Sequence, residues 1–500
     1  MKQAVVIGSG FGGLSAAGYL ARAGYQVTVV EKNGWVGGRA RVLERDGFRF
    51  DMGPSWYWMP GEHDKWFRDM GKERTDYYAI RRVDPSYKVY YGETEPREEE
   101  NVLTMPADLE GAKALFERYE AGAGRRLEEY LEDCRRKYEL AMATYIYKNY
   151  DTIFDFISAK TIRNLGTLNI ASSYKGMIKK YFSHPYLRKI LEFPVVFLGS
   201  SARKTPAVYT LMNYIDFVLG TWYPSGGFAR VVEAMREVDE SLGVTFRFNS
   251  EAKGLSLADG RVTSVRCVTP EGDAVFPADV VVANADYHHV EQELLPEEAR
   301  SFSPRFWEKR SLAPGVLNYY VGLNGKFESF EHHTFFFDSD WEGHFKAVYE
   351  KPDWLEKPLF YIHAPSISDP SSAPPGKEAV FILVPIAPGL DEDEGVRQRY
   401  FDDVVDRIEA LTGEPFRERI EFVESYSLKD FERDYNAYKG NAFGLGQTLF
   451  QTAYFRTANR SKKVSNLYFS GHYTVPGTGT TMSTISGNVV TQRVVEEQGV

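Results

Sequence analysis

The first residues of the chain place a glycine-rich turn directly after a short apolar run. Ala4–Ile7 is wholly apolar, which is typical of a strand buried in a parallel sheet. Gly8, Gly10 and Gly13 then form a G-x-G-x-x-G motif. In such motifs the first glycine permits a tight turn, the second lets the backbone approach a pyrophosphate, and the third lets a helix pack closely on the strand. The motif therefore predicts a nucleotide-binding α/β unit.

The residues that follow agree with this prediction. We expect a helix over 14–23, ended by Gly24, whose first N–H groups would bind phosphate. The next predicted strand, Gln26–Val30, leads to Glu31, where a carboxylate can accept both ribose hydroxyls. An ordinary glycine turn is the alternative, but the strand, the helix and the acid all favour a nucleotide. Glu31 favours the unphosphorylated ribose of FAD or NAD over that of NADP.

Two further glycine motifs bear on the choice between FAD and NAD. GWVGGRARV (34–42) has a second glycine pair before Arg39, and GFRFDMGPSW (47–56) reads as a strand that breaks at Gly53 and Pro54. Glycines bring backbone close to a ligand, and Arg39 can neutralise a pyrophosphate. A surface arginine is the alternative for Arg39.

Size and composition exclude several classes of protein. A chain of 500 residues is expected to form two or three domains. Its net charge of -10 argues against a nucleic-acid-binding protein, which needs basic surface for phosphates. Cys134 and Cys267 have no metal or dithiol spacing, and the pairs His288-His289 and His332-His333 would point to opposite faces of a strand, so we predict no metal. No apolar run approaches the ~18 residues that a membrane span needs.

Four motifs together resemble those of bacterial-type phytoene desaturases, the carotenoid desaturase family of the flavin amine oxidase superfamily. They are GGRA with DMGPSWYWMP, a W-x-P-x-G-G turn, a G-x-A-F-G-L…Q-x-A-x-F-R-x-x-N segment, and a C-terminal Thr-x-Pro-Gly-x-Gly turn. The residues that carry the last three motifs are Trp222, Pro224, Gly226 and Gly227; Gly440, Ala442, Phe443, Gly444, Leu445, Gln451, Ala453, Phe455, Arg456 and Asn459; and Asn466, Leu467, Tyr468, Gly471, Thr474, Pro476, Gly477 and Gly479. The resemblance covers essentially the whole chain.

The resemblance implies an α/β protein with a Rossmann-like FAD-binding domain that is discontinuous in sequence. Residues 1–66, 221–290 and 441–500 would form this domain, and 67–220 and 291–440 a mixed α+β substrate domain. The predicted cofactor-binding residues are Gly8, Gly10, Phe11, Gly12, Gly13, Glu31, Lys32, Gly38, Arg39, Gly53, Pro54, Ser55, Ala252, Gly471, His472 and Met482.

The C-terminal stretch is predicted to complete the FAD site. A strand at Leu467–Ser470 would join the first sheet, and a helix beginning near Met482–Ser486 would direct its N-terminus at the flavin C2 carbonyl. The chain departs from the family pattern at His472-Tyr473, where small residues are usual, and at Thr480–Met482. These departures bear on the substrate more than on the cofactor.

A basic segment lies inside this acidic protein. Residues 156–191 hold seven Lys and Arg residues and no acid, and 174–181 predicts an amphipathic helix with Lys175, Lys179 and Lys180 beside its apolar face. One interpretation is that 156–200 docks on an anionic membrane; the other is a helix that faces the core with a solvated basic side. With a water-insoluble substrate, we expect a cytoplasmic protein that is peripheral on the inner face of the cell membrane.

The predicted function is that of an FAD-dependent carotenoid desaturase that converts phytoene toward lycopene by hydride transfer to flavin N5. Without metal or dithiol, electrons would pass from flavin to oxygen or a quinone. No catalytic residue is nominated, because an allylic cation loses a proton without a strong base. Alternatives are another carotenoid desaturase, saturase or isomerase of this fold, such as a hydroxycarotenoid 3,4-desaturase or a diapophytoene desaturase, and a prenyl-lipid carrier resembling the GDP-dissociation inhibitors.

Overall fold

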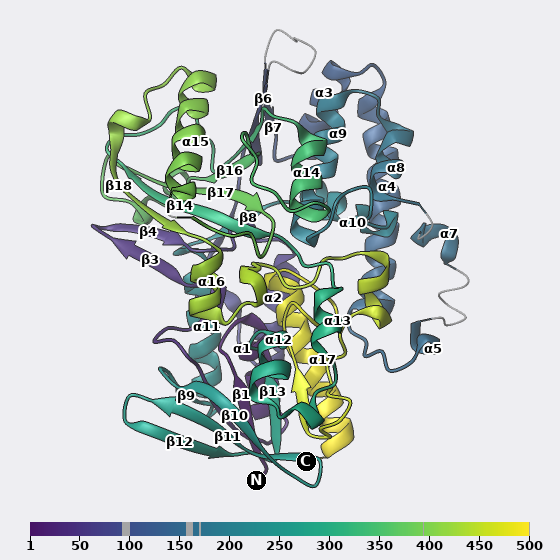
Figure 1. The fold of residues 1–500 in the computed structure, drawn as a ribbon. Helices are drawn as coiled ribbons and strands as arrows, with labels where there is room; N and C mark the ends of the chain where they lie inside the picture. Colours follow the sequence, from purple (N-terminus) through teal and green to yellow (C-terminus); the bar gives the residue numbers. More distant parts are fainter. Residues whose placement is uncertain (93–100, 157–163, 170–171, 394, 500) are drawn as a thin grey trace.

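A computed structural model describes residues 1–92, 101–156, 164–169, 172–393 and 395–499 (Figure 1). A five-stranded sheet lies in the lower half of Figure 1, near both chain ends, in the order β19-β13-β1-β2-β9. All neighbouring pairs in it are parallel. Its strands are β1 (Gln3–Ile7), β2 (Gln26–Val30), β9 (Thr245–Arg247), β13 (Val280–Ala283) and β19 (Leu467–Phe469). Three separated parts of the sequence thus build one sheet, and the strands predicted near 4, 26 and 467 are confirmed.

Helices α1 (Phe11–Arg22) and α17 (Thr480–Gln498) pack against each other beside this sheet. Their close approach depends on Gly487, because a Cβ there would lie 2.5 Å from the Cβ of Ser15. Helix α17 begins at Thr480, so the predicted start near Met482–Ser486 is wrong by at least two residues. Gly479 precedes the helix at φ 108°, a backbone angle that favours glycine and fixes the start there.

Smaller elements complete the part around the parallel sheet. One of them is an antiparallel sheet of β10 (Glu251–Ala258), β11 (Arg261–Thr269) and β12 (Gly272–Pro277). A separate hairpin joins β3 (Val42–Arg45) to β4 (Phe48–Asp51). The remaining elements are α2 (Pro60–Asp69), β5 (Ile80–Arg82), β8 (Trp222–Pro224), α11 (Gly227–Ser241), α12 (Tyr287–His289), α13 (Pro304–Glu308) and α16 (Leu428–Tyr435).

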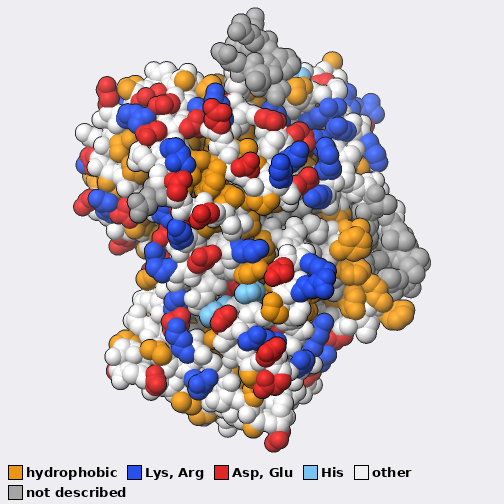
Figure 2. Space-filling model, viewed as in Figure 1, with side chains coloured by type: hydrophobic (Ala, Val, Ile, Leu, Met, Phe, Trp, Pro, Cys, Tyr) orange, Lys and Arg blue, Asp and Glu red, His pale blue; other side chains and the backbone are white. Residues whose placement is uncertain are grey.

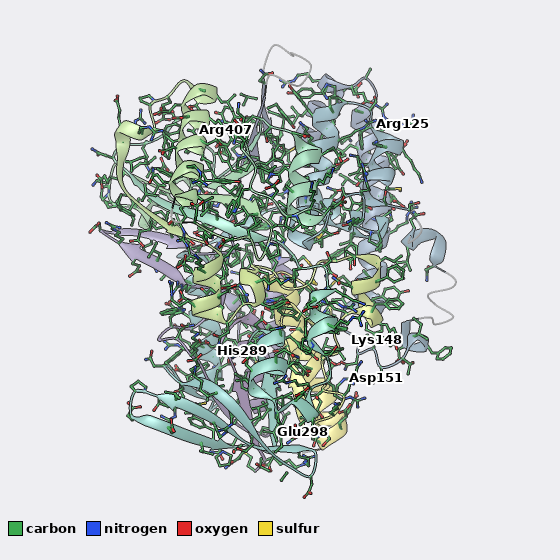
Figure 3. The ribbon with its side chains drawn as sticks, viewed as in Figure 1. Arg125, Lys148, Asp151, His289, Glu298 and Arg407 are labelled. Carbon is green, nitrogen blue, oxygen red and sulfur yellow. The ribbon has the colours of Figure 1, made fainter. Side chains whose placement is uncertain are left out.

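A seven-stranded mixed sheet forms the upper half of the molecule, in the order β18-β14-β17-β16-β15-β6-β7. Only its β15–β6 pair is parallel. Helix α15 (Val396–Thr412) covers one face, and Arg407 on it binds Asp338 and donates to the carbonyl of Pro358 (Figure 3). The strands are β6 (Tyr87–Tyr91), β7 (Val102–Met105), β14 (Gly315–Leu323), β15 (His333–Phe337), β16 (Phe360–His363), β17 (Glu378–Ile386) and β18 (Ile420–Tyr426).

Helices pack on the other side of β6, β7 and β15 in one large apolar core. The predicted amphipathic helix is α8 (Tyr174–Tyr181), and Tyr174, Met177 and Ile178 on its apolar face are buried in this core. The core-facing interpretation of this helix is therefore the one observed, while Lys179 and Lys180 are exposed. The other helices here are α3 (Leu109–Tyr119), α4 (Ala123–Ala141), α5 (Ile153–Phe156), α7 (Leu165–Leu168), α9 (Pro185–Glu192), α10 (Leu211–Tyr214) and α14 (Trp341–Tyr349).

Part of the predicted basic segment, including Lys160 and Arg163, falls outside the described residues. Within the described ranges, no helix combines the length and apolar character needed to cross a bilayer. The predicted domain division at residues 66, 220, 290 and 440 stays a prediction.

Candidate cofactor and substrate site

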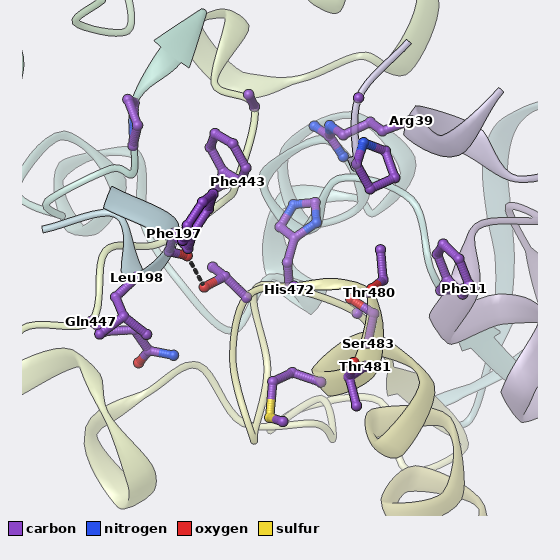
Figure 4. A pocket seen from close by; sticks show the side chains of 18 of the residues that line it. Phe11, Arg39, Phe197, Leu198, Phe443, Gln447, His472, Thr480, Thr481 and Ser483 are labelled. Carbon is purple, nitrogen blue, oxygen red and sulfur yellow. Dashed lines mark hydrogen bonds between the residues drawn. The ribbon is translucent and has the colours of Figure 1, made fainter. Parts of the chain in front are cut away.

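A cavity of about 550 Å³ extends from the carboxyl ends of β1 and β2 to the seven-stranded sheet (Figure 4). Its glycine end is lined by the turn after β1 and by the C-terminal turn. Its aromatic end is lined by side chains from the seven-stranded sheet and the helices beside it. Of the sixteen predicted cofactor residues, all but Gly13 line this cavity.

Gly13 acts behind the cavity wall. A Cβ at this position would overlap the carbonyl oxygen of Gly8, so only glycine lets α1 lie against the turn. Gly10 precedes α1, no side chain caps the helix, and its first turn holds no acid. The first N–H groups of α1 are therefore available for a phosphate, which helix N-termini bind readily.

Glu31 lies at the tip of β2, is 6% exposed, and is held by its neighbours. Its Oε2 accepts hydrogen bonds from the backbone N–H and the hydroxyl of Ser9, both at 2.8 Å, and its Oε1 accepts one from the N–H of Asn33 at 2.9 Å. Lys32 next to it donates to the side chain of Asn436 at 2.9 Å. The carboxylate is thus fixed at the cavity wall where a ribose is expected.

Arg39 is partly buried and lines the cavity. Its guanidinium lies over the rings of Tyr435 and Phe431, 5.3 and 5.9 Å from their centroids, and donates to the carbonyl of Asn441 at 3.2 Å. Its Nε is buried and has no hydrogen-bond partner. Stacking on two rings leaves this donor available to an anion at the glycine end.

His472 projects into the cavity near Arg39 (Figure 4). It fits only because position 444 is glycine, since a Cβ at Gly444 would overlap the imidazole. Burial and the charges of Arg39 and Arg456 hold the pKa of His472 well below its usual value, so the ring is neutral. Its Nε2 is buried without a partner. His472, where the family usually has a small residue, therefore places a polar atom without a hydrogen-bond partner at the glycine end of the cavity.

The N-terminus of α17 also opens into the cavity. Gly479 provides no side-chain cap, and Thr480, Met482 and Ser483 of the first turn line the wall (Figure 4). Together with the uncapped start of α1 and the Nε–H of Arg39, the first N–H groups of α17 place hydrogen-bond donors at several points along one cavity. Nε2 of His472 adds a further polar atom there. The residues present fit a dinucleotide that carries a pyrophosphate and a carbonyl-bearing ring, as FAD does.

The aromatic end has a different chemistry. The ring of Trp56 lies between 5.5 and 5.9 Å from those of Trp58, Phe193, Phe197 and Phe335. Among the described lining residues, the carboxylates all come from the glycine end of the cavity: Glu31, Glu251, Asp286 and Asp434. An aromatic wall without charged side chains suits a long hydrocarbon and not a polar amine.

Asn284 was missed by the sequence reasoning. It follows β13, and its amide packs so tightly between Gly10, Gly12 and Gly471 that a Cβ on any of them would lie 2.6 to 2.9 Å from it. A polar residue at the end of a buried parallel strand was the available signal. Asn284 joins the N-terminal and C-terminal glycine turns.

The two histidine pairs do not both lie in strands, contrary to the expectation from the sequence. His288 and His289 lie in helix α12, so the strand assumption was wrong for them. His332 and His333 meet His363 from β16, with 3.2 Å between the Nε2 atoms of His332 and His363. No group of His, Cys, Asp or Glu in the described ranges has the geometry to hold a metal.

Comparison with known proteins decides the family. Residues 11–495 match the family model described as flavin containing amine oxidoreductase. The chain belongs to this family. Over 99% of its length it is 41% identical to a carotenoid 3,4-desaturase of Haloarcula japonica, covering 98% of that protein, and 31% identical to a zeta-carotene-forming phytoene desaturase of Myxococcus xanthus, covering 94%. The predicted resemblance to carotenoid desaturases of this superfamily is thus confirmed.

Solved structures agree on the fold. An oxidoreductase from Methanosarcina mazei matches 99% of this flavoprotein and all of its own chain with a TM-score of 0.65 at 16% identity. Putrescine oxidase matches with a TM-score of 0.61 at 14% identity, over 99% of both chains. The protein is an FAD-dependent oxidoreductase of the CH-CH type, as predicted, and FAD is its cofactor.

Proposed function

We propose that the protein is a carotenoid desaturase in which the cavity holds FAD at its glycine end and a polyene at its aromatic end. The observation that carries this proposal is the continuity of the two ends in one cavity. A substrate carbon in the aromatic end can therefore meet the flavin without crossing solvent. Similarity to curated carotenoid desaturases of two organisms supports the substrate class.

We assign the cofactor contacts as follows. Glu31 would bind the adenosine ribose, the first turn of α1 and Arg39 the pyrophosphate, and the N-terminus of α17 the flavin carbonyl. Ala252 lies at the cavity wall close to the strand tips, where we place the adenine. FAD supplies the acceptor for a hydride from the substrate.

We assign binding of the polyene, and stabilisation of positive charge on it, to the aromatic end of the cavity. Ring faces of Trp56, Trp58 and Phe197 can hold a polyene by burial, and they favour positive charge that develops along it. The described residues there offer no carboxylate to trap that charge. Because a polyene cation is strongly acidic, a water molecule can accept the neighbouring proton, so the new double bond forms without a dedicated base.

The sequence identities to the two relatives favour 3,4-desaturation over conversion of phytoene toward lycopene. The relative that acts at the 3,4 position is 41% identical, against 31% for the phytoene desaturase. We retain phytoene as the second candidate substrate.

We also propose peripheral membrane association, cytoplasmic location on the inner face of the cell membrane, and oxygen or a quinone as electron acceptor. A carotenoid dissolves in lipid, so the enzyme must meet its substrate at a bilayer. We further propose a division into an FAD domain (1–66, 221–290 and 441–500) and a substrate domain (67–220 and 291–440), which is supported by the separation of the two large sheets.

Product analysis tests this function. The FAD-loaded protein is incubated with phytoene or with a lycopene-type carotenoid, and products are separated by chromatography. A product two hydrogens poorer than its substrate supports the proposal, and its identity decides between the candidates. A protein without a flavin spectrum would instead favour a lipid carrier; Rab GDI of Plasmodium falciparum shares this fold with a TM-score of 0.56.

A further inference from the structure

We propose that an anionic phospholipid bilayer docks on one particular surface, where exposed apolar side chains surround the cavity mouth beside a cationic groove. This inference rests on the proposed function, because a carotenoid substrate is what brings the enzyme to a bilayer. It moves the contact away from helix α8, to which the sequence pointed.

The apolar half of the surface, here called the apolar collar, consists of α5 and the two turns η13 (Leu449–Gln451) and η14 (Ala453–Phe455). Ten large hydrophobic side chains are exposed among the described residues, and five of them lie in the collar. Clustering of this kind marks an interaction site, whereas single exposed residues do not. The five, with their exposed fractions, are Phe154 (77%), Phe450 (70%), Phe455 (42%), Leu449 (38%) and Tyr454 (36%).

The collar adjoins the substrate end of the cavity. Leu449 and Phe455 belong to the collar and also line the cavity, as do Thr452 and Ala453 between them. A hydrocarbon leaving a bilayer at the collar would therefore enter the cavity without passing through water.

A cationic groove lies directly beside the collar and shares Phe450, Tyr454 and Phe455 with it. Its two acids, Asp151 and Glu497, both lie within 3.5 Å of Arg460. The protein as a whole carries a net charge of -10, so this local excess of cations is a departure from the average. The cations that line the groove are Arg261, Arg310, Arg456, Arg460, Lys462 and Lys463.

Arg310 and Lys462 are the cations best placed for a lipid phosphate. Within the described part of the chain, neither has a carboxylate within ion-pair distance. Arg310 lies over the ring of Phe306 at 4.0 Å and Lys462 over that of Phe302 at 4.7 Å, which holds both charges in the groove wall. The Nε of Arg310 is buried without a hydrogen-bond partner. A phosphate that approaches the partly exposed Arg310 side chain would therefore meet no competing carboxylate among the described residues.

The apolar collar and the cationic groove together favour an anionic lipid as the ligand of this surface. Free phosphate would need only the groove, and an apolar protein surface only the collar. An anionic lipid needs both, with headgroups over the groove and acyl chains against the collar. Figure 2 shows an apolar patch with Lys and Arg side chains next to it on this side of the molecule, and Figure 3 places Asp151 near α5. Helix α8 lacks this combination, because its apolar face is buried.

Flotation with vesicles of phosphatidylglycerol and phosphatidylcholine tests the proposal on the full-length, FAD-loaded protein. We compare R310E/K462E and F154S/F450S with K179E/K180E, which makes the same charge change as the first variant but on α8. Each basic residue near an anionic surface contributes to binding, so loss of the two cations alone should weaken binding of R310E/K462E about 30-fold, and the two added carboxylates should weaken it further. F154S/F450S should bind more weakly to anionic and to neutral vesicles, and K179E/K180E should bind like the wild type.

Several results would overturn the proposal: no binding by the wild type, wild-type binding by R310E/K462E, or a loss confined to K179E/K180E. Competition by inorganic phosphate at millimolar concentration with no role for F154S/F450S would indicate a free-anion site instead. Flavin absorbance and melting temperature confirm folding, and R310E/K462E, which changes only partly exposed side chains, stays informative if F154S/F450S misfolds.

Activity separates this inference from the proposed function. With carotenoid in neutral detergent micelles, R310E/K462E should convert substrate at the wild-type rate, and with anionic vesicles it should be slower. A wild type that converts nothing in micelles refutes the function, while the vesicle-binding result still decides the docking surface.

Discussion

The glycine end of the cavity is shaped by backbone, whereas the aromatic end is shaped by side chains. At the glycine end, Gly10, Gly12 and Gly471 leave no room for a Cβ because Asn284 packs against them. At the aromatic end, rings of Trp56, Phe197 and Phe335 meet at centroid distances near 5.6 to 5.8 Å. Backbone walls tolerate almost no change, but rings can be exchanged for others of similar volume. Cofactor binding should therefore be far more sensitive to substitution than substrate choice.

Gly13→Ala should have the largest effect. The added methyl group would overlap the carbonyl oxygen of Gly8, and backbone cannot swing aside as a side chain can. We expect loss of stability of about 3 kcal/mol or more and less than a tenth of the wild-type FAD content. Thermal unfolding and the flavin spectrum measure both. Gly61→Ala is the control, because nothing lies within 4 Å of a Cβ there; if both variants behave alike, the backbone account of the glycine end is wrong.

Glu31→Gln should weaken FAD binding without unfolding the protein. The amide keeps the shape but loses the charge and cannot accept from the Ser9 and Asn33 donors on both atoms. Hydrogen bonds to charged groups contribute about 1.5–3 kcal/mol, so the Kd for FAD should rise roughly 10- to 100-fold. Titration of the apoprotein with FAD measures it, with exposed Glu44→Gln as control. An unchanged Kd would remove Glu31 from the ribose site.

Phe197→Leu should act on the substrate alone. It removes ring contacts to Trp56 and Trp58 at 5.6 and 5.2 Å, and such pairs contribute about 0.5–1.5 kcal/mol. We expect a rise in KM for carotenoid of about 2- to 10-fold and the wild-type Kd for FAD. Phe276→Leu, a partly buried ring on β12 outside the cavity, is the matched control. A change in FAD affinity as large as the change in KM would contradict the separation of the two ends.

Asp216→Asn should have the smallest effect on the cavity itself, because we expect it to change only the pH dependence of stability and neither FAD nor substrate binding. Burial raises the pKa of Asp216 from 3.8 to about 7 in the core beside the aromatic end. Below pH 4 the carboxyl is protonated in both states; above it the unfolded chain loses the proton first, so the native state loses stability as pH rises toward 7. Between pH 5 and 8, the free energy of unfolding of the variant should rise by about 1–3 kcal/mol relative to that of the wild type. Urea unfolding at several pH values measures it. If the difference in unfolding free energy between the two proteins did not change with pH, the Asp216 carboxyl would be ionised in the native core.

The glycine end of the cavity could be predicted from the sequence, whereas the aromatic end could not. The glycine motif, Glu31 and the buried strands are local patterns, and the structure places them as expected. Asn284 was missed because its role depends on two glycine turns that are distant in sequence. The start of α17 was placed too late, since the composition of the stretch gives no sign of where Gly479 ends the turn.

The aromatic end offered no such local pattern. Trp56, Phe197, Phe335 and Tyr361 come from four separate parts of the chain, and only the register of the seven-stranded sheet and the helices beside it bring them together. Periodicity did find helix α8, yet it could not tell a face buried in protein from one offered to lipid. Both would show the same spacing of apolar residues.

Anaerobic mixing of the FAD-loaded protein with a carotenoid tests the central claim most directly, because it follows electrons from the aromatic end to the glycine end. The flavin absorbance near 450 nm should bleach in a single turnover, with about one carotenoid two hydrogens poorer formed per flavin. Phe197→Leu should require more carotenoid for half-maximal bleaching. A flavin that stays oxidised with phytoene and with lycopene-type carotenoids would contradict the account.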